Sequence, residues 1–204
     1  MKIQILSNIH GNLPELEECD LLILNGNISP VFKQSHKQLM EHWLMENFVP
    51  WIVETKANNV IFVPGEYDVV LSPKNKSYSK LLNSILTLTG SKMIIPIGSK
   101  SNKIVGFPYQ LSDNKFKGFS CDEEKFKKEL NKLPDNIQTL VCNTDLNCDV
   151  FKAFVEEKKP KLIITNTQRE KPRVASKHMN TVILQYSYCQ NDFETPFDNV
   201  EWIL

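Results

Sequence analysis

The chain has 204 residues, of which 41% are hydrophobic and 24% charged, and its 24 Lys and Arg residues balance 24 Asp and Glu residues. This length and balance predict one folded domain with a sizeable core, and zero net charge argues against a general binder of nucleic acid or anionic membranes. No apolar run approaches the roughly 20 residues of a membrane span, and no signal-peptide core is visible, so we expect a cytoplasmic protein without a membrane span.

The five cysteines are odd in number and show no C-x-x-C spacing. Neither a disulfide framework nor a zinc site is indicated by this pattern. Free thiols in a reducing compartment are therefore expected. The residues are Cys19, Cys121, Cys142, Cys148 and Cys189.

Short β-rich runs alternate with helical stretches along the chain. Strands are predicted at Lys2–Ser7, Leu21–Leu24, Val60–Val63, Met93–Ile97, Lys103–Phe107, Thr139–Cys142, Lys161–Thr165, Pro172–Ala175 and Thr181–Tyr186. Helices are predicted at Gln34–Lys56, Glu123–Leu133 and Cys148–Lys158, and Pro50 should kink or restart the first. This order predicts an α/β protein with more than one sheet layer. We expect a single domain over residues 1–204, with a small surface excursion at 71–90.

Polar loops follow five of the predicted strands, each at the carboxyl end. In α/β sheets this edge is where ligands bind, so five such loops make a plausible site. For any one loop, ordinary loop polarity explains the composition equally well. The loops are Asn8-Ile9-His10, Asn25-Gly26-Asn27, Gly65-Glu66-Tyr67-Asp68, Asn143-Thr144-Asp145 and Asn166-Thr167-Gln168.

Taken in order, these loops resemble the signature of the calcineurin-like metallophosphoesterases. That signature reads D-x-H, G-D, G-N-H-D/E, a lone H and G-H-x-H. The corresponding stretches here are Asn8-Ile9-His10, Gly26-Asn27, Gly65-Glu66-Tyr67-Asp68, Asn143 and Thr165-Asn166-Thr167-Gln168. The resemblance covers nearly the whole chain and implies a four-layer α/β/β/α sandwich, with two mixed sheets flanked by helices.

In that family the signature residues bind two metal ions, and the histidine of the third block protonates the leaving group. Only His10 keeps a ligand identity in this chain, and Tyr67 stands where the catalytic histidine belongs. Asp68 is retained without its usual histidine partner. The remaining ligand positions carry Asn8, Asn27, Glu66, Asn143, Asn166 and Gln168.

Neutral amides are weak ligands for divalent ions, and the carboxylate that would bridge both ions is replaced at Asn27. A two-metal centre is therefore not expected. In a pocket without cations, facing carboxylates would repel one another, whereas amides carry donors and acceptors and can satisfy one another. We accordingly expect no catalytic residue and no cofactor.

Three functions remain open on the sequence. The first is a catalytically inactive metallophosphoesterase-like protein that binds a protein partner as a scaffold subunit. The second is a weakly active phosphoesterase, a hydrolase that uses one weakly bound divalent ion at His10, Glu66 and Asp68. The third is a protein that binds a nucleotide or another phosphate-containing small ligand without cleaving it.

Overall fold

A computed structural model describes most of the chain, including the loops that follow the predicted strands. Most of the predicted excursion at 71–90 lies outside the described residues. The structure describes residues 2–31, 36–72, 86–87, 92–97, 100–112, 118–144, 146–166, 173–190 and 195–197.

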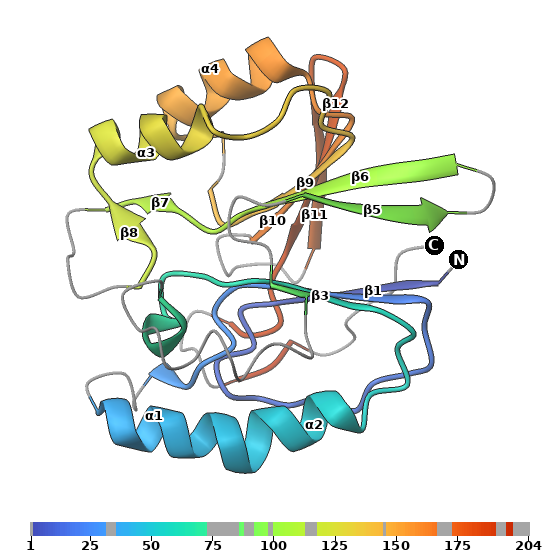
Figure 1. The fold of residues 1–204 in the computed structure, drawn as a ribbon, viewed down its shortest axis with the longest axis vertical. Coiled ribbons are helices and arrows are strands. Elements are labelled where there is room, and N and C mark those ends of the chain that lie inside the picture. Colours follow the sequence, from blue (N-terminus) through green and yellow to red (C-terminus); the bar gives the residue numbers. More distant parts are fainter. Residues whose placement is uncertain are drawn as a thin grey trace.

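Two main sheets form the centre of the fold (Figure 1). The smaller sheet has the order β1-β2-β3-β4, and all its described pairs are parallel. The larger sheet has the order β11-β12-β10-β9-β6-β5; its inner pairs are parallel, and β11 and β5 add antiparallel edges. The smaller sheet comprises β1 (Ile3–Ser7), β2 (Leu21–Asn25), β3 (Val60–Val63) and β4 (Leu86–Thr87). The larger comprises β5 (Lys92–Ile97), β6 (Lys100–Phe107), β9 (Thr139–Cys142), β10 (Leu162–Asn166), β11 (Arg173–His178) and β12 (Thr181–Tyr186).

Successive side chains of a strand point to opposite faces of its sheet, so each buried strand contributes to two layers of the core. On β2, Leu22 and Leu24 pack under the helix of residues 37–53, whereas Leu21 and Ile23 pack toward the larger sheet. The layer between the two sheets also contains Ile61 and Val63 of β3, with Ile104, Val141, Ile164 and Tyr186 of the larger sheet. The predicted fold class is confirmed: two main sheets are stacked and flanked by helices.

One long helical segment covers the smaller sheet and changes its winding in the middle. It runs through α1 (Lys37–Trp43), a π-helical turn (Leu44–Phe48) and α2 (Val49–Val53). Pro50 lies at the start of α2. It has no N–H to donate in an α-helical hydrogen bond, and in a regular α-helix its ring would clash with a carbonyl group of the preceding turn. The wider π turn accommodates this proline, so the predicted restart at Pro50 takes the form of a π bulge.

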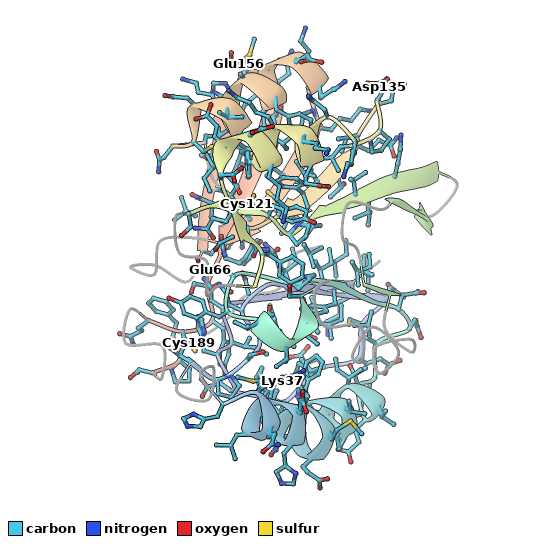
Figure 2. All side chains as sticks on the ribbon, turned by 60° about the vertical axis from the view of Figure 1, so that its left-hand side comes forward. Lys37, Glu66, Cys121, Asp135, Glu156 and Cys189 are labelled. Atoms are coloured by element: carbon cyan, nitrogen blue, oxygen red, sulfur yellow. The ribbon has the colours of Figure 1, made fainter. Side chains whose placement is uncertain are left out.

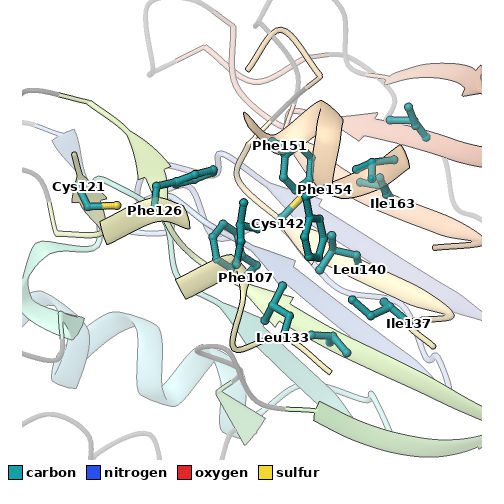
Figure 3. Close-up of a cluster of buried hydrophobic side chains, with 14 residues drawn as sticks. Phe107, Cys121, Phe126, Leu133, Ile137, Leu140, Cys142, Phe151, Phe154 and Ile163 are labelled. Carbon is teal, nitrogen blue, oxygen red and sulfur yellow. The ribbon is translucent and has the colours of Figure 1, made fainter. Parts of the chain in front are cut away.

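Two shorter helices cover the outer face of the larger sheet and enclose the second core, α3 (Glu123–Leu130) and α4 (Asp149–Lys158) (Figures 1 and 3). The Asp122 side chain accepts a hydrogen bond from the Lys125 N–H and so caps α3. Phe126 of α3 meets Phe107 of β6 edge to face, with ring centroids 5.3 Å apart.

Several short elements were not predicted, because runs of two or three residues carry no readable periodicity. They are β4, β7 (Gln110–Leu111), β8 (Ser120–Cys121) and a 3-10 turn at Val69–Leu71. None of the five cysteines forms a disulfide. In the part of the chain that the structure describes, no helix has the length and apolar character needed to cross a membrane.

Phe48 should be among the costliest side chains to remove from the first core. It is fully buried in contact with the rings of Trp43, Trp51 and Phe62. We expect Phe48→Ala to lower the free energy of unfolding by about 3–5 kcal/mol, because it leaves a cavity that these rings cannot fill. Met45→Ala on the exposed side of the same π turn serves as control and should change it by less than about 0.5 kcal/mol. Urea unfolding measures both, and equal costs would contradict the packing described.

Candidate functional site

The two sheets bring four asparagines together at the carboxyl ends of their strands. Asn8 follows β1 and Asn27 lies two residues beyond β2, in the smaller sheet. Asn143 follows β9 and Asn166 ends β10, in the larger sheet. Asn8, Asn27 and Asn143 are buried, and Asn166 is half-buried. We refer to these four residues as the amide cluster.

The amides of the cluster bond directly to one another. Asn27 donates from Nδ2 to Oδ1 of Asn8 at 2.9 Å, within the smaller sheet. Asn166 donates to Oδ1 of Asn143 at 3.2 Å and to Oδ1 of Asn8 at 3.5 Å. Each of these contacts joins an N–H donor to a carbonyl oxygen. The sequence predicts such hydrogen bonds between the amides of the pocket.

Groups around the cluster complete its hydrogen bonding. The Oδ1 atom of Asn27 accepts from the Tyr67 backbone N–H at 3.0 Å. Asn143 donates to the carbonyl of Pro64 at 2.7 Å, and Asn8 donates to the Ser187 hydroxyl at 3.3 Å. The cluster therefore lies in a closed set of bonds, because each of these three amides also has a partner outside the cluster.

The backbone of this site is held in left-handed conformations. Asn8 has φ 54°, His10 has φ 46° and Asn27 has φ 52°. Such values are uncommon for residues other than glycine, and asparagine tolerates them better than most. Gly26, directly before Asn27, has φ 69°, and a Cβ there would lie 2.1 Å from Oδ1 of Asn143. The loop geometry thus favours Asn or Gly at several of its positions independently of any ligand.

Asp68 fastens two of the loops together. Its Oδ2 atom accepts from the backbone N–H groups of Asn27 at 2.9 Å and Gly65 at 2.8 Å. Its Oδ1 atom accepts from those of Ile28 and Ser29, both at 3.0 Å. Complete burial raises the pKa of the Asp68 carboxyl above its ordinary value, and these backbone donors oppose the shift. Both carboxylate oxygens of the retained aspartate are thus used in hydrogen bonds to backbone N–H groups.

His10 and Tyr67 form an aromatic pair beside the cluster. Their ring centroids lie 5.4 Å apart in an edge-to-face arrangement, and His10 is buried while Tyr67 is half-buried. Glu66 is also buried, and its backbone carbonyl accepts a hydrogen bond from Gly118 N–H at 2.8 Å. Figure 2 shows Glu66 at the level where the two halves of the molecule meet.

The sequence prediction omitted one residue of the site, Ser187, and named one that lies beyond the described residues. Ser187 follows β12, so the rule of polar groups after parallel strands identifies it once that strand is placed in the sheet. Asn25 belongs to one of the predicted polar loops, but the sequence indicates no specific role for it. Gln168 falls outside the described residues, so its place in the site stays a prediction.

The residues present do not fit a two-metal centre. The contact of 2.9 Å between Asn27 and Asn8 would join two oxygens if both were aspartates, which a cation would have to bridge. Here the N–H of an amide fills that position. Among the described residues, no three His, Cys, Asp or Glu side chains lie where they could share a metal ion.

Comparison with solved structures identifies the type of fold. The phosphopantetheinyl hydrolase PptH of Mycobacterium tuberculosis is similar over 94% of this chain and 90% of its own, with a TM-score of 0.60 and 11% sequence identity. The sulfate thiohydrolase SoxB of Thermus thermophilus is similar over 82% of this chain and 33% of its own, with a TM-score of 0.53 and 16% identity. A 5′-nucleotidase structure from Staphylococcus aureus covers 91% of this chain and 48% of its own, with a TM-score of 0.54 and 12% identity.

These neighbours are calcineurin-like metallophosphoesterases. The fold is of the metallophosphoesterase type. No protein-family model matches the sequence, and no curated protein matches it. At these identities the likeness concerns the fold, and the chemistry of the site has to be argued from its own residues.

Asp68→Asn should destabilise the fold although it changes the shape of the side chain very little. An amide presents one NH₂ group where the carboxylate presented an oxygen, so two backbone N–H donors would lose their acceptor. We expect a loss of about 2–4 kcal/mol in the free energy of unfolding, measured by urea titration.

The matched control is Asp122→Asn at the start of α3. That side chain also accepts a backbone N–H, but at an exposed helix end where Asn caps as well as Asp. We expect a change within about 0.5 kcal/mol. A similarly small change for Asp68→Asn would contradict the fastening role of Asp68.

The double variant Asn8→Asp/Asn27→Asp tests the reason for the amides. It places two carboxylate oxygens at a contact that is now a hydrogen bond of 2.9 Å. We expect a loss of about 3 kcal/mol or more at pH 7 in the absence of divalent ions, because a buried charge lacks a partner. One of the two carboxyls should have a raised pKa, so this loss should shrink as the pH falls and the pair takes up a proton.

Asn136→Asp/Asn180→Asp is the charge-matched control, with both changes at exposed turn positions. It adds the same two charges without bringing them together. Thermal unfolding in chelator across pH 4–8 compares both pairs with the unaltered chain. A pH-independent loss in the double pocket variant would show that charge repulsion is not its cause.

Proposed function

We propose that the chain is a catalytically inactive metallophosphoesterase-like protein that serves as a binding or scaffold subunit. The observation that carries this proposal is the amide cluster. The side-chain N–H groups of its four asparagines donate to one another and to neighbouring protein groups, so these amides are bonded within the protein. A site of this kind stabilises the fold and leaves the surface of the domain to contact other molecules.

The loss of the general acid supports the same proposal. Tyr67 replaces the histidine that the family resemblance places there, and a phenol is a much weaker acid than imidazolium near neutral pH. The backbone N–H of Tyr67 donates to Oδ1 of Asn27, and this bond holds the loop against the amide cluster. The third loop therefore contributes to the hydrogen bonding of the pocket in place of acid catalysis.

The single-ion phosphoesterase receives less support from the geometry. That alternative needs Asp68 as a ligand, but both of its oxygens already accept two backbone N–H groups each. Redirecting this carboxylate to an ion would leave four buried donors without an acceptor. His10 and Glu66 then remain, and two side chains are few for a divalent ion.

A phosphate-ester ligand also receives less support. Among the described residues, the pocket groups are neutral amides, one imidazole and the buried carboxylates of Glu66 and Asp68. Phosphate carries negative charge and is held in proteins by cations, Arg or Lys side chains, or unsatisfied backbone N–H groups. The N–H groups of Asn27, Ile28 and Ser29 are already bonded to Asp68.

Metal content and hydrolysis test the proposal together. We expect the purified chain to contain far less than one equivalent of Mn, Fe or Zn by mass spectrometry. We also expect hydrolysis of bis(p-nitrophenyl) phosphate at the rate of buffer alone, with or without added Mn²⁺. Two tightly held equivalents of metal would overturn the proposal, and so would turnover that depends on metal.

His10→Ala is the control for contaminating enzymes. Residual hydrolysis that persists in this variant comes from another protein, whereas hydrolysis that disappears with the His10 imidazole belongs to this chain and contradicts the proposal. The scaffold part is checked separately in cells that produce the protein naturally. A tagged chain should elute from gel filtration in equimolar complex with a partner, and elution as a monomer under conditions that preserve complexes would contradict it.

A further inference from the structure

Asn25 is the last residue of β2, and its position in the strand directs it between the sheets. Side chains alternate along a strand, so Asn25 shares a face with Leu21 and Ile23, which pack against the larger sheet. Asn25 is fully buried, and β2 lies between β1 and β3 in the smaller sheet. A polar side chain at the end of this apolar face needs partners from the opposite sheet.

Two carbonyl groups of the larger sheet provide those partners. The Nδ2 atom of Asn25 donates to the carbonyl of Cys142 at 2.9 Å and lies 3.5 Å from that of Ile164. Cys142 ends β9 immediately before Asn143, and Ile164 lies on β10 two residues before Asn166. The Asn25 amide therefore bonds to the backbone next to Asn143 and lies near the backbone two residues before Asn166, the two members of the amide cluster that come from the larger sheet.

Only the donor side of this amide is used among the described residues. The Oδ1 atom of Asn25 is buried and has no hydrogen-bond partner in the described part of the chain. A carboxylate at this position would turn oxygen toward two carbonyl oxygens, and an aliphatic residue would leave both carbonyls without this donor. The position thus requires a short side chain that donates.

We propose that Asn25 is the positioning residue of the pocket. Through its two donor contacts it sets the separation of the two sheets at their carboxyl ends, and so the distance at which the two halves of the amide cluster meet. Close packing next to it depends on the same separation, since Gly26 lies against Asn143 with no room for a Cβ. This role concerns how the pocket is assembled and holds whether or not the chain is an enzyme.

The proposal makes a differential prediction, because the contacts of the cluster fall into two kinds. The bond of Asn27 to Asn8 lies within the smaller sheet. The bond of Asn143 to the Pro64 carbonyl connects the larger sheet to the loop after β3. Removing the Asn25 donor should loosen the contact between the sheets and leave the contact within one sheet intact.

Side-chain amide signals in nitrogen-15 NMR spectra test this difference. In Asn25→Leu, which keeps the size of the side chain but not the donor, we expect hydrogen exchange at the Asn143 NH₂ to rise about tenfold, as loss of two modest hydrogen bonds would produce. Exchange at the Asn27 NH₂ should stay as in the unaltered chain. Asn59→Leu is the control, because its amide donates to a backbone carbonyl at the opposite, exposed end of the sheet.

Asn25→Asp gives an independent test through pH. A protonated carboxyl can donate to one carbonyl, whereas the ionised form cannot, and burial raises the pKa of such a group. The Asn143 signal should therefore approach that of the unaltered chain as the pH falls, when the two proteins are compared at each pH. Asn25→Leu should show no such recovery.

Two results would overturn the proposal. One is an Asn143 amide in Asn25→Leu with unchanged shift and exchange. The other is parallel acceleration at Asn143 and Asn27, which indicates general loosening of the fold instead of a change in sheet separation. If Asn25→Leu does not fold, the pH comparison of Asn25→Asp decides, and absence of recovery at low pH rejects the donor role.

Discussion

Four backbone N–H groups converge on the carboxylate of Asp68, and the geometry of the pocket depends on this convergence. Three of them come from the consecutive residues Asn27, Ile28 and Ser29, and the fourth comes from Gly65. The carboxylate thereby fixes the loop after β2 against the loop after β3. Asn27 is held in its left-handed conformation at the same time, and its side chain reaches Asn8 from that backbone position.

In the function that we propose, the hydrogen bonds of the amide cluster have the role that cations have in a two-metal site. A cation holds oxygens together by attracting each of them, and an amide N–H does the same for a neighbouring carbonyl with a smaller charge and a fixed direction. In the function that we propose, these hydrogen bonds hold the strand ends of the two sheets together. The asparagines at positions 8, 27, 143 and 166 stabilise one another, and Asn25 holds the two sheets at the separation that this requires.

Much of the fold and part of the site could be predicted from the sequence. Periodicity gave the main strands and helices, and the position of polar loops after parallel strands placed Asn8, Asn27, Asn143 and Asn166 at one edge, where the structure brings them together. The pattern could not give the partners of Asn25, because two carbonyls more than a hundred residues away accept its bonds. It gave Asp68 a place in the motif and made it a candidate ligand for a single ion, but it could not give the bonds of Asp68 to four backbone N–H groups, since backbone N–H directions depend on the folded loop. Gln168 stays a prediction, and the π turn before Pro50 depends on packing as well as on the proline.

The left-handed backbone at Asn8 and Asn27 restricts which side chains can occupy these positions. Branched and bulky residues are strained there, whereas asparagine and aspartate are both tolerated. The codons of these two amino acids differ only in their first base, so a single transition in the gene exchanges a neutral amide for a carboxylate at a site whose backbone accepts either. The loop backbone thus favours exchange between Asn and Asp at these positions. One base change in the gene can therefore introduce or remove a carboxylate that could bind a metal ion.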